Sequence, residues 1–434
     1  MSGGEYSIMA RPLPNMICGD GQIESVGKHV KKLGCSRAFV VSDPGLKAAG
    51  VLDRVTSLLE AASIEVVVFP EVPANPTFDC VAAGIAKLAG RFENTAVLSL
   101  GGGSSMDAAK AMAVIGPQCG SVDNTKVDAW TADLCKAIGD YTFYPQLSDD
   151  GESMDVTTMR PKRVGEQPPL PIIAVPTTSG TASETNGAAV LTDAKAQRKV
   201  IFSDDRAAAR LAILDPALTL GLPAYPTATC GMDVLTHALE ALTSARRNPY
   251  SGAIAMGAIQ TVAQWLPVLM NDLSNSEARL RMMTASHMAG VAFGIAGLGI
   301  CHAMGHPLSA VLHQAHGQTL ATLLPHVMRF NMEECVEEYA AVARAFGVAD
   351  AKLSALENAE AAVAAVAALS IRVGTARSIR AMGGNDSNIS ELCDQAMLDI
   401  CMLTTPRMAS RDDIATIYRQ ALDDPTLYPA SAKL

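Results

Sequence analysis

The histidines of this chain gather in its second half, where several stand at helical spacing from other potential metal ligands. In the segment Asp233-Val-Leu-Thr-His237 a carboxylate and an imidazole are four residues apart. His302 and His306 repeat this spacing, and His316 follows directly before Gly317. Residues four apart share one face of a helix and can bind the same ion. Imidazoles with one or two carboxylates suit Zn(II) or Fe(II), with one coordination position left for a substrate.

These spacings have a second explanation. A lone histidine on an apolar helix is more often a core residue with a hydrogen-bond partner than a metal ligand. The recurrence of the pattern, with a further imidazole after it, favours the metal site.

Two glycine-containing segments in the first half follow predicted strands and are suited to the phosphates of a nucleotide. Gly101-Gly-Gly-Ser-Ser105 begins a predicted helix, where glycines let backbone N–H groups approach a phosphate. Pro176-Thr-Thr-Ser-Gly-Thr181 offers hydroxyl groups, and Asp43 ends a strand where an acid can bind a ribose 2′-hydroxyl. Neither segment has the G-x-G-x-x-G fingerprint, and each alone could be a tight turn. Together they favour a dinucleotide.

The elements that would position these residues change type near residue 220. Before it, apolar runs alternate with helical stretches, and the runs predict strands at residues 38–42, 65–69, 96–100, 172–175 and 211–214. Such runs are typical of a parallel sheet covered on both faces and built from βαβ units. Ala/Leu/Met-rich helical patterns follow. We predict an α/β domain over residues 1–216 and an all-helical domain over 217–434, with the ligand site between them.

Two segments differ from this pattern. Residues 116–169 join two core strands by a long, partly irregular path with a predicted helix at 127–138. Such an insertion is either functional, as long loops often are, or a tolerated surface feature. Residues 288–301 form the most apolar stretch, which is short and interrupted by glycine and therefore predicts a buried helix rather than a membrane span.

Composition narrows the partners and the compartment. The net charge of −10, with no long basic run, predicts that the protein has no nucleic-acid partner. Ten cysteines without a C-x-x-C pair indicate a reducing compartment, and the polar N-terminus has no signal peptide, so we expect a cytoplasmic protein. The final Ala432-Lys433-Leu434 is similar to a peroxisomal targeting tripeptide, or is a chance ending.

In combination, these segments resemble the iron-containing (group III) alcohol dehydrogenases. The residues that carry the resemblance are, in order, Gly101–Lys110, Pro176–Glu184, Gly231–Glu240, Gly299–Leu308 with His316-Gly317, and Leu324–Asn331. The resemblance covers about residues 10 to 424. It implies an α/β N-terminal Rossmann-like dinucleotide-binding domain followed by an all-α C-terminal metal-binding domain.

The resemblance also implies roles for individual residues. The metal ligands would be Asp233, His237, His302 and His316. His306 would lie beside the nicotinamide and help to move a proton, and Phe293 and Cys401 would flank the substrate. The NAD site would be lined by Asp43, Asn75, Gly102, Gly103, Ser104, Asp107, Thr177, Thr178, Thr181, Val190 and Lys199.

The implied activity is that of a metal-dependent, NAD-linked alcohol dehydrogenase or aldehyde reductase acting on a small alcohol or aldehyde. The metal would be Fe(II) or Zn(II), and NAD would be preferred to NADP because Asp43 would repel a 2′-phosphate. We expect no membrane partner and a homodimer or larger homo-oligomer.

Two alternatives share the scaffold. A hydroxyacid–oxoacid transhydrogenase with tightly held NAD would turn over without added cofactor. A metal-dependent lyase of the related dehydroquinate synthase-like branch is less favoured, because the four-ligand set is complete. The departures from the family pattern bear on the substrate: a longer segment between the two cofactor loops, Thr404-Thr-Pro-Arg407 where Asn-Pro-Arg is common, and the extra imidazole of His313.

Overall fold

The computed structural model describes residues 13–119, 127–143, 146–147, 154–155, 166–195 and 198–427. The remainder of the 116–169 segment and the tripeptide Ala432–Leu434 lie outside the described residues. The proposed roles of both therefore stay predictions.

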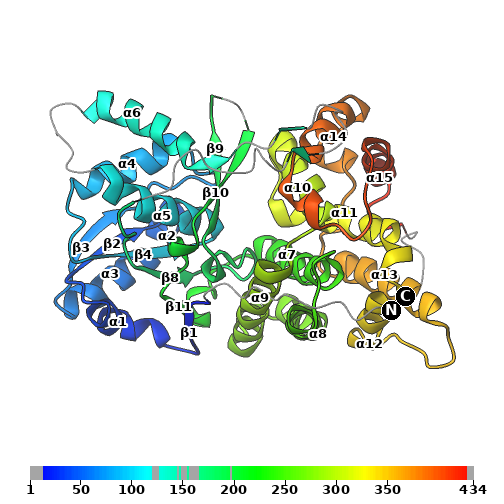
Figure 1. The fold of residues 1–434 in the computed structure, drawn as a ribbon. Helices are drawn as coiled ribbons and strands as arrows, with labels where there is room; N and C mark the ends of the chain where they lie inside the picture. Colours follow the sequence, from blue (N-terminus) through cyan, green and yellow to red (C-terminus); the bar gives the residue numbers. More distant parts are fainter. Residues whose placement is uncertain are drawn as a thin grey trace.

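Six parallel strands form the main sheet of the N-terminal domain (Figure 1). Their order is β1-β11-β8-β4-β2-β3, and every neighbouring pair runs parallel. The strands are β1 (Asn15–Cys18), β11 (Leu211–Leu214), β8 (Ile172–Pro176), β4 (Thr95–Gly101), β2 (Arg37–Val41) and β3 (Glu65–Phe69). Each of the five predicted strands is present, and β1 is an additional strand at one edge.

Helices cover both faces of this sheet. They are α1 (Val26–Lys32), α2 (Pro44–Ala48), α3 (Val51–Ala61), α4 (Phe78–Leu88), α5 (Gly103–Ile115) and α6 (Val127–Asp140). Alternate residues of one strand enter two different cores: Phe39 packs with the side chains of α4 and α5, whereas Val40 packs with those of α1 and α3. Burial on both faces explains why these strands are continuously apolar.

A smaller antiparallel sheet lies at the boundary between the two domains (Figure 1). It contains β9 (Ala188–Asp193) and β10 (Arg198–Ser203), with the two-residue strand β5 (Thr142–Phe143) beside β10. A further two-stranded pair joins β6 (Gln146–Leu147) and β7 (Met154–Asp155). The sequence analysis did not predict these strands.

The C-terminal domain is helical, as predicted. Its helices are α7 (Ala224–Thr243), α8 (Pro249–Asn271), α9 (Ser276–Ala296), α10 (Ile300–Leu312), α11 (His316–Phe330), α12 (Val336–Ala345), α13 (Ala355–Arg372), α14 (Ile389–Met397) and α15 (Arg411–Asp423). Helix α7 packs against α8, α9 and α11, so most of its side chains are buried.

The apolar stretch 288–301 is largely helical and buried, as predicted, but it belongs to two helices, so the prediction of a single helix was wrong. Helix α9 ends at Ala296, Gly297 adopts a φ of 84°, and α10 begins at Ile300 in a direction that differs by 112°. A side chain at Gly297 would be strained at this positive φ, so glycine ends the helix here. The break directs the N-terminus of α10 toward α7.

Among the described helices, α8 alone has the length and apolar composition that would suffice to cross a membrane, and the bent pair α9–α10 meets the same criteria only when counted as one span. Core helices meet the same two criteria, and α8 packs against α7, α9 and α12. The expected lack of a membrane partner stays a prediction.

Candidate metal and cofactor site

Three helices of the C-terminal domain bring the expected metal ligands together. Asp233 and His237 lie one turn apart on α7, and His302 comes from the first turn of α10. His316 is the first residue of α11. Asp233, His237 and His302 are buried, whereas the side chain of His316 is 28% exposed. The group is therefore enclosed on one side and open on the side of His316.

The carboxylate of Asp233 lies at the centre of this group. Its Oδ1 is 3.3 Å from Nδ1 of His237, 3.7 Å from Nε2 of His302 and 3.9 Å from Nε2 of His316. Ligand atoms that each bind one ion at about 2 Å lie roughly 3–4 Å from one another. The separations thus fit a single divalent ion at Asp233, His237 and His302, whose ligand atoms all lie within 4.8 Å of one another, whereas His316 lies outside this group.

Unused hydrogen-bonding atoms support this fit. Within the described part of the chain, Asp233 Oδ1, His237 Nδ1 and His302 Nε2 are buried and lack a hydrogen-bond partner. Buried polar atoms without a partner are costly and rare in folded proteins. Three of them facing one point are explained by a cation that they bind together.

The electrostatics favour the protonation state that a metal requires at His237 and Asp233, but oppose it at His302. Burial lowers the pKa of His237 to about 4, which keeps its imidazole neutral. Burial alone would raise the pKa of Asp233, but the neighbouring His237, His302 and His316 hold it well below its usual range. Burial also lowers the pKa of His302, but Glu240 and Asp233 outweigh this effect and raise it to about 9. Metal binding should therefore release a proton from His302.

The three residues expected near the substrate border the metal group. The ring of Phe293 stacks on His237 at 4.6 Å, and the ring of His306 stacks on His316 at 5.1 Å. Nδ1 of His306 lies 2.6 Å from Oδ2 of Asp399, and Oδ1 of the same carboxylate accepts a hydrogen bond from the backbone N–H of Cys401. Phe293 and His306 thus contact metal ligands, and Cys401 groups with His306 and Asp399, their possible ligand atoms lying within 4.8 Å of one another.

His313, the extra imidazole, does not join the group. It is exposed and ends α10 with a φ of 51°, a left-handed conformation that commonly terminates helices. Its position gives it a structural role at the end of the helix.

The two expected phosphate-binding segments lie side by side in the N-terminal domain. Gly102 is the N-cap of α5, and the backbone N–H of Thr177 donates to the carbonyl of Gly101. A Cβ atom at Gly103 would lie 2.9 Å from Cγ2 of Thr181. The glycines therefore allow close packing of the two loops, and the free N–H groups at the start of α5 can face an anion.

The other expected cofactor residues surround these loops. Asp43 is the N-cap of α2, and its Oδ2 lies 3.5 Å from Oγ of Ser105 at the start of α5. The hydroxyl of Ser104 donates to the carbonyl of Ala74, beside the exposed Asn75. The carboxylate of Asp107 accepts from the backbone N–H of Val190 on β9 at 2.9 Å.

Lys199 connects the cofactor group with the metal group. It lies on β10, and burial lowers its pKa, while the charges of Asp107 and Asp399 act in the opposite direction. The charge of Lys199 in turn helps to lower the pKa of His316. Lys199 is therefore within electrostatic range of Asp107 in the cofactor group and of Asp399 and His316 beside the metal ligands.

Three charged residues of this region were missed. Glu240 contacts His302, Asp399 contacts His306, and the buried Lys110 donates to Ser183 and to the carbonyl of Ala188. Glu240 stands seven residues after Asp233 on the same face of α7, so helical periodicity could have identified it. Asp399 lies 93 residues from His306 in a segment without a regular pattern, and no local signal predicts it.

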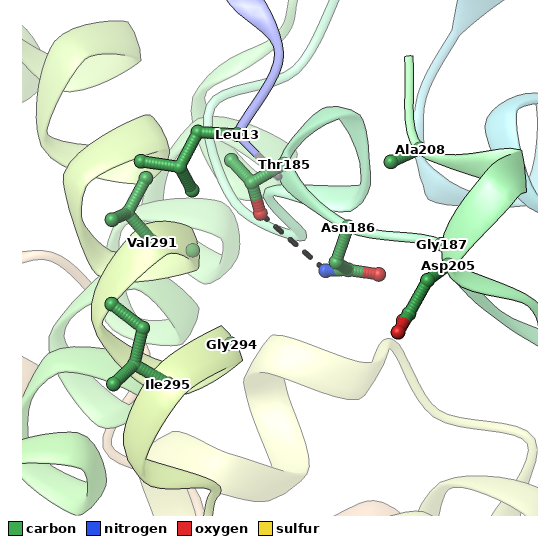
Figure 2. A pocket seen from close by; sticks show the side chains of 10 residues that line it. Leu13, Thr185, Asn186, Gly187, Asp205, Ala208, Val291, Gly294 and Ile295 are labelled. Atoms are coloured by element: carbon green, nitrogen blue, oxygen red, sulfur yellow. Dashed lines mark hydrogen bonds between the residues drawn. The ribbon is translucent and has the colours of Figure 1, made fainter. Parts of the chain in front are cut away.

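A small cavity lies where the loop 185–187 faces α9 (Figure 2). It is lined by Thr185, Asn186 and Gly187 on one side and by Gly290, Gly294 and Ile295 on the other, and its volume is about 20 Å³. This volume suits a single water molecule and not a dinucleotide or a substrate. The cavity is therefore a packing feature of the domain junction.

Gly317 offers a test of how the metal group is assembled. A Cβ atom there would overlap the backbone carbonyl oxygen of Thr229 on α7, which cannot rotate away. Gly317→Ala should therefore force α11 away from α7, destabilise the fold by about 1–3 kcal/mol and move the adjacent His316 away from Asp233. Thermal unfolding and metal affinity measure the two effects.

Gly252→Ala on α8 is the matched control, because its Cβ would meet only Leu242 at an ordinary 3.8 Å. This control should be neutral or slightly stabilising, since alanine is the better helix former. Equal behaviour of the two variants would contradict the close α7–α11 packing as the support of His316.

Comparisons with known proteins agree with this arrangement. Residues 14–216 match the family model described as iron-containing alcohol dehydrogenase, and residues 227–422 match that of the C-terminal part of the same family. The chain is 34% identical to the 1,3-propanediol dehydrogenase of Klebsiella pneumoniae, over 96% of this chain and 99% of that protein. It is 31% identical to the NAD-dependent methanol dehydrogenase of Bacillus methanolicus, over 94% and 98% of the two chains.

The similarity extends to three-dimensional structure. The crystal structure of a 1,3-propanediol oxidoreductase superposes with a TM-score of 0.82 at 33% identity, covering 95% of this chain and 99% of the other. Both domains, in the same order, are thus shared along nearly the full length. With the two family models together matching most of the sequence, the chain belongs to the iron-containing alcohol dehydrogenases.

Proposed function

We propose that this oxidoreductase uses NAD and one divalent ion, Fe(II) or Zn(II), to interconvert small primary alcohols and their aldehydes. The observation that carries the proposal is the set of unpartnered, buried ligand atoms of Asp233, His237 and His302. The relatives named for 1,3-propanediol and methanol support a small substrate.

The chemistry that a divalent ion supplies at such a site is Lewis acidity, which lowers the pKa of an alcohol, and nicotinamide supplies the hydride acceptor. Asp233, His237, His302 and His316 would hold the ion. Phe293, stacked on His237, would exclude water from the reacting carbon and limit the size of the substrate.

His306 is suited to moving the proton. Its Nδ1 is held by Asp399, so Nε2 remains as the ring atom that can take or release a proton. The side chain is 20% exposed, which gives the proton a path to solvent. Gly102, Gly103 and the threonines of the second loop would align the cofactor across the domain boundary.

The proposal is tested by reconstituting metal-free protein with Fe(II) or Zn(II) and following NADH absorbance with short primary alcohols, diols and the corresponding aldehydes. NADH formation that needs both the ion and added NAD is the expected result. Hydride transfer from a hydroxyacid to an oxoacid without added NAD would instead identify a transhydrogenase. A lack of activity with every ion and alcohol would overturn the proposal.

A further inference from the structure

Glu240 is a buried carboxylate that the proposed chemistry does not use. It lies on α7 one turn after His237, and the residue is only 5% exposed. Its Oε2 forms a short hydrogen bond with Nδ1 of His302. Its Oε1 accepts from the backbone N–H of Cys301 at 2.7 Å and from that of His302 at 3.3 Å. Both oxygens therefore form hydrogen bonds with the first turn of α10.

The backbone contacts compensate for a missing helix cap. Helix α10 begins after Gly299, which has no side chain to cap the free N–H groups of the first turn. A Cβ atom at Gly299 would lie 3.0 Å from Oε1 of Glu240, so glycine leaves room for the carboxylate. A negative charge at this end of the helix also interacts favourably with the helix dipole. Glu240 thus fixes where α10 starts, and with it the position of His302.

The ring contact determines which nitrogen of His302 is available. A carboxylate can only accept, so Nδ1 carries the hydrogen, and Nε2 is the atom directed at Asp233 Oδ1, 3.7 Å away. A neutral imidazole with its hydrogen on Nδ1 presents a free electron pair on Nε2, as a metal ligand must. Carboxylate partners of this kind orient metal-binding histidines and strengthen their basicity.

We infer that Glu240 is a positioning residue for the metal, which sets both the orientation and the tautomer of His302. The inference rests on the proposed function, because it assumes that His302 binds the ion.

Glu240→Gln separates this role from simple packing, because glutamine has nearly the same size but only one acceptor oxygen. If that oxygen keeps the backbone contacts, the amide NH₂ faces Nδ1 and moves the imidazole hydrogen to Nε2. If it turns to Nδ1, the NH₂ opposes the N–H of Cys301. In either case metal affinity should fall by about 10–100-fold. The measurement is Zn(II) affinity of the full chain by chelator competition, with thermal unfolding of the metal-free protein alongside.

Glu184→Gln is the matched control. Glu184 is also buried and lies 3.2 Å from Nδ1 of His287, but neither residue belongs to the metal group. Its Zn(II) affinity should stay within about twofold of the wild type. Glu240→Asp keeps the charge and should bind Zn(II) more tightly than Glu240→Gln. If the glutamine variant folds poorly, Glu240→Asp is compared with the wild type and Glu184→Gln instead, and it should bind Zn(II) less tightly than both because its shorter side chain weakens the contact with Nδ1 of His302.

Equal Zn(II) affinity of folded Glu240→Gln and wild type would overturn the positioning role alone. Equal losses in Glu240→Gln and Glu184→Gln would also overturn it, because the effect would then be general destabilisation. A wild-type protein that binds no Zn(II) or Fe(II) would overturn the proposed function and this inference together.

Discussion

His302→Ala should lose the bound ion and, with it, about 10³-fold or more of the catalytic efficiency. The imidazole is 1% exposed, and its Nε2 is directed at Asp233 Oδ1, so the alanine variant removes one of the three buried ligand atoms of the group. Lewis-acid stabilisation by a metal contributes several kcal/mol, and each 1.36 kcal/mol corresponds to tenfold in rate. Metal content and kcat/KM, measured on the same preparation, test the expectation.

His302→Ala also removes the imidazole that forms a hydrogen bond with the buried Glu240. The folding of this variant must therefore be checked by circular dichroism. His313→Asn is a suitable control, because His313 is exposed at the end of the same helix and asparagine tolerates its positive φ. The control should keep both metal and activity. Full metal content in a folded His302→Ala protein would show that His302 is not a ligand.

Asp43→Asn should shift the preference between cofactors toward NADP by about 10²-fold. Asp43 stands two residues after the end of β2, where its charge would repel the 2′-phosphate of NADP, a like-charge contact that costs several kcal/mol. Its Oδ1 also caps α2 by accepting from the backbone N–H of Leu46 at 3.1 Å. Asparagine is as good a cap, so this exchange removes the charge and keeps the helix. The ratio of kcat/KM for the two cofactors measures the shift.

Asp53→Asn provides the same change of charge at an exposed position of α3 and should leave the ratio unaltered. If both variants alter the ratio equally, the effect is a general one of net charge. An unchanged ratio in Asp43→Asn would exclude Asp43 from cofactor selection.

The strands of the main sheet could be predicted because burial on both faces leaves a continuous apolar run in the sequence. β3 and β11 have the predicted ends, and β2 and β4 differ from prediction by one residue at each end. The β9–β10 hairpin lacks this signal, since it mixes Lys199 and Thr192 with apolar residues on a partly exposed sheet. The order of the strands in the sheet depends on the helical connections between them. A local sequence pattern does not encode this order.

The site could be predicted in part for a similar reason. Helical spacing indicated that Asp233 and His237 act together. Glu240 lies on the same face of α7 and was not predicted as part of the site. Asp399 acts through a contact between segments 93 residues apart, and only the fold brings it to His306. The break in the apolar run 288–301 was not predicted. It depends on the positive φ of Gly297, which packing determines as much as the sequence does.

The most direct test of the central claim is a titration of the metal-free wild type with Fe(II) or Zn(II), in which bound metal and NAD-dependent alcohol oxidation are measured at each step. Activity should rise in proportion to the bound ion and reach its plateau at one ion per chain, because one group of ligand atoms meets at Asp233. Full activity of the metal-free protein, or activity unrelated to occupancy, would contradict the account.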